Sequence, residues 1–346
     1  MISLPNESSS SNHALSHRSS MLSFPKEPSW WRKLPKDVGM RTAGRIGAAC
    51  NSLLGSIAGN TLGILTYHRV TDPISKVPVP LHNVAPARFR KQIRGLLDRG
   101  FQFWTLSDVI QHHLEGREVP ARTVVLTFDD GFASVHTQAY PSLCELKVPA
   151  TVFVNTAYLD KEAPAPFDAW GVAHHDRVPD EAWRLLTTEE CRCMQASGLI
   201  QIGAHTHTHA DHRGDPEAFR EDVQQSVDIV RSKFFTDQVT FAFPFGGRHT
   251  GFASDELIQA VKRTGAACGL TTEPVLVDPA SDPFCWGRFN VFPWDTSATL
   301  AAKLSGWYSW APKLNKRLGR VAKAALHPHR RFGTTNTGWN GHGGPV

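Results

Sequence analysis

The stretch 124–136 reads VVLTFDDGFASVH. A short run of strand-forming residues leads into two adjacent carboxylates, Asp129 and Asp130, which are followed by Gly131. An ordinary turn needs one aspartate before the glycine, and a second like charge beside it is unfavourable. The pair therefore indicates chemistry at the end of a strand, with a plain Asp-Gly turn as the alternative.

Strand and helix patterns alternate on both sides of this stretch, from LGILTYH (62–68) to ACGLTT (267–272). The expected strands are continuous apolar runs, which are typical of parallel strands covered on both faces. This pattern predicts an α/β fold, and a barrel or a doubly wound sheet fits it equally. Sites in such folds lie at the carboxyl ends of the strands. His68, the aspartate pair, a histidine cluster and an FPFGG turn all fall at such ends.

Composition sets wide limits on the class of protein. The chain has 346 residues, of which 41% are hydrophobic, and a formal net charge of +5. Most of the excess charge lies in 18–45 and 313–331, so a nucleic-acid partner is not expected. We expect a disordered basic segment at 1–60, a single catalytic domain at 61–310 and a basic tail at 311–346. The oligomeric state is left open.

The six cysteines are irregularly spaced, which favours reduced thiols. No secretory signal or transmembrane run is recognised, so we expect a cytoplasmic protein or one at the membrane periphery. Residues 40–59 are basic and weakly amphipathic. Such a segment lies on an anionic membrane surface or packs as a helix against the main domain, and the sequence leaves both open.

The histidine cluster reads IGAHTHTHADHR (202–213) and follows an apolar strand pattern. His205 and His209 are four residues apart, close enough to bind one ion, and Asp130 can supply a third ligand. Two imidazoles and one carboxylate leave positions open for water and substrate. Zinc is the expected divalent ion, and cobalt, nickel or iron also suit these ligands. A solvated histidine-rich loop is the alternative.

The two aspartates then take separate roles. Asp130 stays ionised as a ligand, while Asp129 lies beside a water whose pKa a metal lowers toward about 7. A carboxylate within hydrogen-bond reach can accept the proton of that water, so Asp129 is predicted to be the general base.

TFDDG, the histidine pair of HTHTH and FAFPFG, in this order, resemble the motifs of the polysaccharide deacetylase family, carbohydrate esterase family 4. The resemblance extends over residues 62–304. It implies a distorted (β/α) barrel with Asp129 as general base and Asp130, His205 and His209 as metal ligands. His207 is then not a ligand, and Thr206 orients a neighbour through a hydrogen bond.

The third motif departs from the family pattern. Pro244, Phe245 and Gly246 match it and are expected at the substrate, with a backbone N–H near Phe245 facing the oxyanion. Ala242 stands where the family has an arginine that steadies the base. Arg288 is our candidate replacement, with a surface arginine as the alternative.

The family also uses a histidine as general acid. LTYHRV (65–70) places His68 at the end of the first expected strand, as in a circularly permuted branch that acts on exported glucosamine polymers. A core histidine is the alternative, and His327 and His329 lie in the basic tail. Trp170, in the long connection 166–178, is a candidate for stacking on a sugar ring, unless this loop only covers the barrel rim.

The resemblance implies a metal-dependent hydrolase that removes N-acetyl groups from an N-acetylhexosamine polysaccharide. Hydrolysis of O-acetyl esters or small cyclic amides on the same scaffold is one alternative. A catalytically silent carbohydrate-binding protein is another, which Ala242 favours and the retained acidic and histidine residues disfavour.

Overall fold

The computed structural model describes residues 34–59 and 61–308. The chain divides into two compact units, Met1–Val38 and Gly39–Val346. Only the start of the first helix is described in the first unit, so the fold given below is that of the second. Most of the expected terminal segments, with His327 and His329, lies outside the described residues. The domain boundaries expected from the sequence stay predictions.

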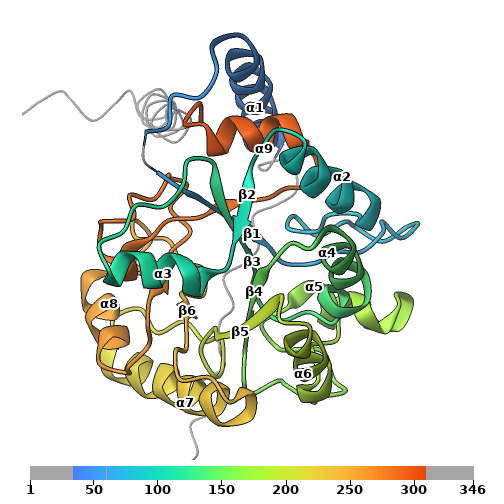
Figure 1. Ribbon diagram of the computed structural model, residues 1–346. Helices are drawn as coiled ribbons and strands as arrows, with labels where there is room; N and C mark the ends of the chain where they lie inside the picture. The colour runs from blue at the N-terminus through green and yellow to red at the C-terminus, as the bar shows by residue number, and fades with distance from the viewer. Residues whose placement is uncertain (1–33, 60, 309–346) are drawn as a thin grey trace, which may run out of the picture. The chain divides into compact units, whose positions relative to one another are not determined.

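One sheet of eight strands lies at the centre of the fold (Figure 1). The strands are β1 (Gly63–Tyr67), β2 (Gln102–Trp104), β3 (Thr123–Phe128), β4 (Ala150–Val154), β5 (Ile200–Ala204), β6 (Phe241–Ala242), β7 (Gly269–Leu270) and β8 (Phe289–Asn290). Their order is β7-β6-β5-β4-β3-β1-β8, and β2 pairs with the first half of β3. All pairings between these strands are parallel. The first and last strands are therefore neighbours.

Helices lie around the outside of the strands, which confirms the distorted (β/α) barrel (Figure 1). They are α1 (Leu34–Leu54), α2 (Pro86–Leu97), α3 (Leu106–Leu114), α4 (Tyr140–Leu146), α5 (Ala169–His174), α6 (Thr188–Ala196), α7 (Pro216–Phe234), α8 (Asp255–Lys262) and α9 (Ser297–Leu304). Side-chain caps begin several of them: Thr105 caps α3, and Thr187 with Glu190 forms a capping box before α6.

Residues 134–147 contain Pro141, which would break a helix if it lay in the helix interior. They form a π-helical turn at Val135–Ala139 that leads directly into α4, with Pro141 in the first turn of α4. Proline is tolerated there because the first N–H groups of a helix have no partner within the helix.

Three neighbouring strands in the middle of the sheet are buried along their whole length. Every residue of β1, β3 and β4 is buried. Phe89 of α2 packs against Tyr67 and Phe128, with ring centroids 5.1 and 5.8 Å apart. This contact fixes the ends of β1 and β3 against a helix, and the polar residues that follow both strands start from a rigid base.

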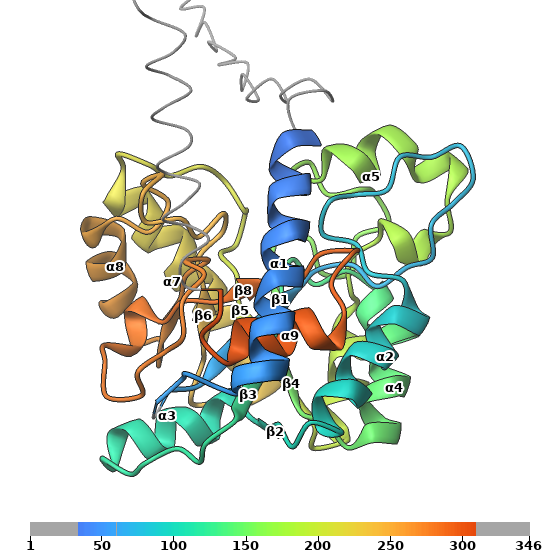
Figure 2. The same ribbon diagram turned by 90° about the horizontal axis from the view of Figure 1, so that it is seen from above.

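Helix α1 crosses over α9 (Figure 2), and two of its glycines, Gly44 and Gly47, face that helix. A side-chain carbon at Gly44 would lie 3.5 Å from Thr299 Cγ2, so the helices approach closely there. The sequence left two alternatives for residues 40–59, a membrane surface or packing against the main domain. The structure shows packing against the main domain along one face of α1. Ile46 and Leu53 remain 50% and 83% exposed. Within 34–59 and 61–308, no helix combines the length and apolar character that crossing a membrane requires.

Replacing Phe89 with alanine should lower the free energy of unfolding by about 3–5 kcal/mol, because the ring is fully buried and leaves a cavity. Phe235, which is 85% exposed, is the matched control, and Phe235→Ala should change stability by no more than about 0.5 kcal/mol. Urea unfolding of both variants measures the difference. Equal losses would contradict the assigned core.

Candidate active site

The two aspartates after β3 point to different partners. The Asp129 N–H donates to Tyr67 O and prolongs the ladder between β1 and β3. Asp130 and Gly131 then both take φ of 69°, a left-handed conformation that turns the chain sharply. Such a conformation costs of order 1 kcal/mol or more for a residue other than glycine and is concentrated at functional sites. The turn places the Asp129 carboxylate inside the sheet edge and that of Asp130 toward the histidines.

Asp129 forms a buried, bidentate ion pair with Arg288. The Asp129 oxygens accept from Nη1 at 2.6 Å and from Nη2 at 2.8 Å. Arg288 also donates from Nη1 to Thr127 Oγ1 and from Nε to Thr271 O. Burial alone raises the pKa of the Asp129 carboxyl, but the charges of Arg288 and His205 outweigh burial and leave that pKa below its ordinary value. The carboxylate is therefore ionised and fixed in orientation.

The Asp129–Arg288 ion pair bears on the third motif, where Ala242 stands in place of the family's arginine. Ala242 is fully buried in β6 and has no guanidinium to offer. Arg288 precedes β8 and is fully buried, so it is not a surface arginine. The guanidinium of Arg288 comes from the opposite end of the sheet to Ala242. It contacts the carboxylate of Asp129, which the family's arginine would steady.

Asp130, His205 and His209 converge on one point. Their nearest ligand atoms all lie within 4.8 Å of one another, and this is the only such group of three metal-ligating side chains among the described residues. Asp130 Oδ1 lies 3.5 Å from His205 Nε2 and 3.4 Å from His209 Nε2. On a tetrahedral ion with bonds of about 2.0–2.1 Å, two ligand atoms are about 3.3–3.4 Å apart. The residues present therefore fit a divalent ion.

The two histidines are oriented by different contacts. His205 Nδ1–H donates to Ala242 O at 2.8 Å, which leaves Nε2 with a lone pair facing Asp130. The His209 N–H donates to Thr206 Oγ1, the neighbour contact expected of that threonine. The His209 ring stacks on Phe167 with centroids 4.2 Å apart and meets the edge of Phe245 at 4.8 Å. A hydrogen bond fixes the first ring, and aromatic contacts cover the second.

His68 lies at the end of β1 on the same edge. Burial lowers the pKa of His68, and the carboxylates of Asp130 and Asp129 only partly offset this effect. Its ring stacks on His82, with centroids 4.6 Å apart and an interplanar angle of 24°. His82 was not singled out from the sequence, where it stands in a Pro-rich connection without a motif.

The loop that carries Trp170 contributes a different aromatic to the cluster. Trp170 lies over the Arg69 guanidinium at 5.0 Å and donates from Nε1 to Pro78 O, and no ring contact joins it to the three clustered side chains. Phe167, three residues earlier, stacks on His209 instead. Asp168 pairs with Arg69 and ties this loop to the residue after His68. Sequence reasoning missed Phe167 because a single phenylalanine in a loop has no distinguishing pattern.

The third-motif turn closes the site on the other side. Phe245 is 51% exposed and has φ of 60°, and Gly246 follows with φ of 49°. A side-chain carbon at Gly246 would lie 2.8 Å from the Thr272 nitrogen, so only glycine fits. Pro244 begins this turn, and its carbonyl accepts from the Gly246 N–H.

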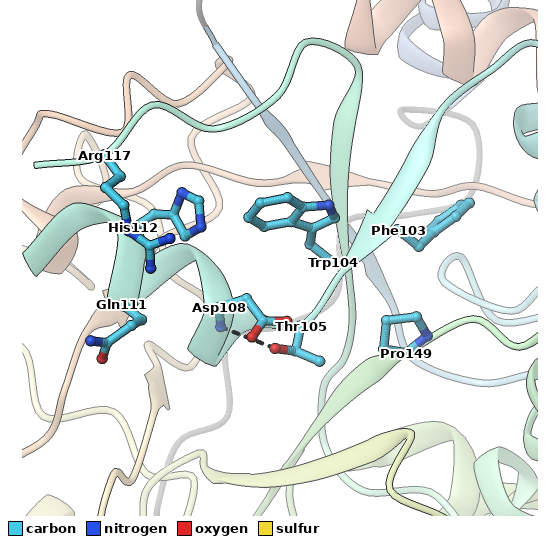
Figure 3. A pocket seen from close by; sticks show the side chains of 8 residues that line it. All are labelled: Phe103, Trp104, Thr105, Asp108, Gln111, His112, Arg117 and Pro149. Atoms are coloured by element: carbon cyan, nitrogen blue, oxygen red, sulfur yellow. Dashed lines mark hydrogen bonds between the residues drawn. The ribbon is translucent and has the colours of Figure 1, made fainter. Parts of the chain in front are cut away.

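A separate hollow of about 410 Å³ lies between β2 and α3 (Figure 3). Phe103, Trp104 and His112 are among its lining residues. It contains none of the residues predicted for the site.

Comparison with known proteins finds related sequences. Residues 116–269 match the family model for polysaccharide deacetylase. The poly-beta-1,6-N-acetyl-D-glucosamine N-deacetylase of Staphylococcus epidermidis is 26% identical over 267 residues, covering 72% of this chain and 84% of the relative. The protein of that name from Staphylococcus aureus is 24% identical over 246 residues, covering 65% and 77%.

Solved structures share the fold. IcaB from Ammonifex degensii superimposes with a TM-score of 0.58 at 24% identity, covering 72% of this chain and 98% of that one. The Streptococcus pyogenes deacetylase PplD also gives 0.58, at 21% identity and 70% and 98% coverage.

Fold and cluster together define a parallel (β/α) barrel with polar residues gathered at the carboxyl edge of its sheet. Residues 116–269 of the chain match a polysaccharide deacetylase domain, and the relatives and solved structures that resemble the chain are deacetylases by name or by fold.

Purified protein should bind one divalent ion per chain, and the His205→Ala/His209→Ala double variant should lose it, because two of three ligands are removed. His207 lies in the same segment, and its Nδ1 pairs with Thr156 Oγ1 outside the cluster. His207→Ala is therefore the control and should keep full metal content. Elemental analysis measures all three proteins, and a metal-replete double variant would refute the ligand assignment.

Proposed function

We propose that this chain is a metal-dependent hydrolase that removes N-acetyl groups from a polymer of N-acetylglucosamine. The observation that carries the proposal is the meeting, at one sheet edge, of the Asp130–His205–His209 cluster with the Asp129–Arg288 pair and His68. The names of the staphylococcal relatives support the β-1,6-linked polymer as the substrate. The reaction adds water to the amide and yields acetate and a free amine.

Asp130, His205 and His209 are the residues that would hold the ion. A divalent ion there supplies a Lewis acid, which polarises the acetyl carbonyl and acidifies water, and zinc is the expected ion. Cobalt, nickel and iron also suit two imidazoles and one carboxylate. Burial raises the pKa of the Asp130 carboxyl, but its contacts with His205 and His209 outweigh burial and leave that pKa well below its ordinary value, so the ligand is ionised.

Asp129 is the proposed general base. Each carboxylate oxygen has two lone pairs, so accepting one hydrogen bond from Arg288 leaves the carboxylate able to accept the proton of the attacking water. Arg288 is a positioning residue in this scheme, because the bidentate contact fixes the plane of the carboxylate. A base with a lowered pKa is also ionised throughout the neutral range.

His68 is the proposed general acid. Amide hydrolysis needs an acid because the leaving nitrogen departs poorly as an anion. A histidine whose pKa is lowered gives up its proton readily once it carries one. A backbone N–H near Phe245 is the proposed donor to the oxyanion that develops on the acetyl oxygen.

The aromatic residues around the cluster are proposed to contact the sugar chain. Phe245 is half exposed beside His209, so part of its ring is available to a ligand. Pro244 and Gly246 shape the turn that presents it. Trp170 stays a candidate for stacking on a sugar unit farther from the scissile bond.

Asp129→Asn should reduce kcat on a soluble N-acetylglucosamine oligomer by about 10²–10⁴, because the amide is nearly isosteric and cannot accept the proton. Metal content should be unchanged, because the ligands remain. Asp176→Asn, at an exposed position, is the control and should retain parental kcat. A kcat for Asp129→Asn within a few-fold of the parent would show that another group is the base.

His68→Ala should lower the rate of N-deacetylation by about 10² or more and largely spare hydrolysis of an activated aryl acetate, whose leaving group needs no proton. The fall in rate on the alkaline side of the pH profile should disappear, because that fall reports loss of the acid's proton. Steady-state kinetics on both substrates measure the split. Equal effects on amide and ester would mean that His68 is structural.

A further inference from the structure

We propose that His82 is a positioning residue for His68: its stacked ring fixes the orientation of the imidazole that gives the proton. The inference rests on the proposed function, because it assumes that His68 is the acid. It concerns a residue outside every motif of the site.

An imidazole that transfers a proton needs a fixed ring, and a hydrogen bond at the second nitrogen usually provides this. His205 follows that rule through its bond to Ala242 O. His68 does not, because its Nδ1 is buried and no residue between 34 and 308 that the structure describes gives it a hydrogen-bond partner. Among the described residues, a contact other than a hydrogen bond at Nδ1 is therefore left to restrict rotation of this ring.

The stack with His82 is the contact that can do so. The two rings are 4.6 Å apart and within 24° of parallel, so rotation of either ring about its Cβ–Cγ bond would drive it into the other. The backbone of His82 is itself tied to the strand end, since Arg69 N–H donates to His82 O and Val84 N–H donates to Arg69 O. Both rings are thus anchored to the same short stretch beyond β1.

The far face of His82 rests on a fixed aromatic base. Its ring lies 5.5 Å from that of Phe292, which stacks in turn on Trp294 at 4.9 Å and an angle of 5°. The Phe292 N–H donates to Asp295 Oδ2, and this carboxylate forms a buried ion pair with Lys303 at 2.7 Å. Four rings therefore run from His68 to a base that a buried charge pair fixes on α9.

His82 orients its neighbour without adding charge. Burial lowers the pKa of His82 to about 3, and a charge on His68 would lower it further, whereas Asp130 and Asp129 act in the opposite direction. The ring is neutral at neutral pH and is unsuited to donate the proton itself. A carboxylate in the place of His82 would raise the pKa of His68 and make His68 a weaker acid. A neutral ring in that place does not raise the pKa of His68.

Two substitutions separate the flat ring from the ring nitrogens. His82→Phe keeps the stack and removes both nitrogens, while His82→Leu keeps apolar volume and removes the flat face. On a soluble β-1,6-linked N-acetylglucosamine oligomer, we expect His82→Phe within about three-fold of the parent kcat and His82→Leu about 10²-fold lower, since a small misplacement of a catalytic group costs this much. KM should change by less than about two-fold, and hydrolysis of an aryl acetate should be spared in both.

His112→Ala is the control. It removes a histidine ring from an aromatic contact of 4.8 Å with Trp104, outside the site, and should leave both activities unchanged. Full N-deacetylase activity in folded His82→Leu would overturn the inference. Equal losses in His82→Phe and His82→Leu would also overturn it, because the nitrogens would then matter and not the stack.

His68→Ala, measured in parallel, separates the inference from the function on which it rests. If His68→Ala is crippled toward the oligomer while His82→Leu is fully active, the acid assignment stands and the inference alone fails. Parental N-deacetylation by His68→Ala would remove the acid assignment, and the role of His82 with it.

Discussion

The buried ion pair between Asp129 and Arg288 is the contact on which the arrangement of the site depends. It joins residues at the end of β3 and just before β8, which lie on either side of β1. Placing two charges in a protein interior is costly unless their geometry is good and their other hydrogen-bonding groups are satisfied. Arg288 meets this condition by also donating to Thr127 Oγ1 and Thr271 O. The Thr127 hydroxyl in turn donates to Leu65 O, so the polar network crosses three adjacent strands.

The polar side chains of the site are fixed by several kinds of contact. An ion pair fixes Asp129, and a hydrogen bond to a strand carbonyl fixes His205. Aromatic rings flank His209, and a ring stacks on His68. The backbone adds a further constraint, since Asp130 and His209 both take positive φ. Such conformations persist only where the surrounding structure determines them, which the packed strand ends do here.

The connection between β4 and α6 links the two sides of the site. Phe167 covers the ring of His209, and the adjacent Asp168 forms a buried ion pair with Arg69, next to His68. The Arg69 guanidinium lies 3.8 Å above the Phe132 ring and donates to Ala182 O. Gly171 permits this arrangement, because a side-chain carbon there would lie 2.2 Å from the Asp168 carboxylate. The loop is therefore a packed wall of the site and not only a cover on the barrel rim.

The amino-acid sequence by itself determined the parallel α/β architecture and the polar residues at its strand ends. Continuous apolar runs, the adjacent aspartates and the four-residue spacing of His205 and His209 are local patterns, and local patterns are readable without coordinates. The tertiary structure decided which distant residues complete them. Arg288 is 159 residues from Asp129, and only the order β3-β1-β8 brings the two together. His82 and Phe167 carry no motif, because a ring contact depends on how loops from separate strands fold over one edge. Trp170, chosen for its residue type, packs on Arg69, and its contact with a sugar stays a prediction.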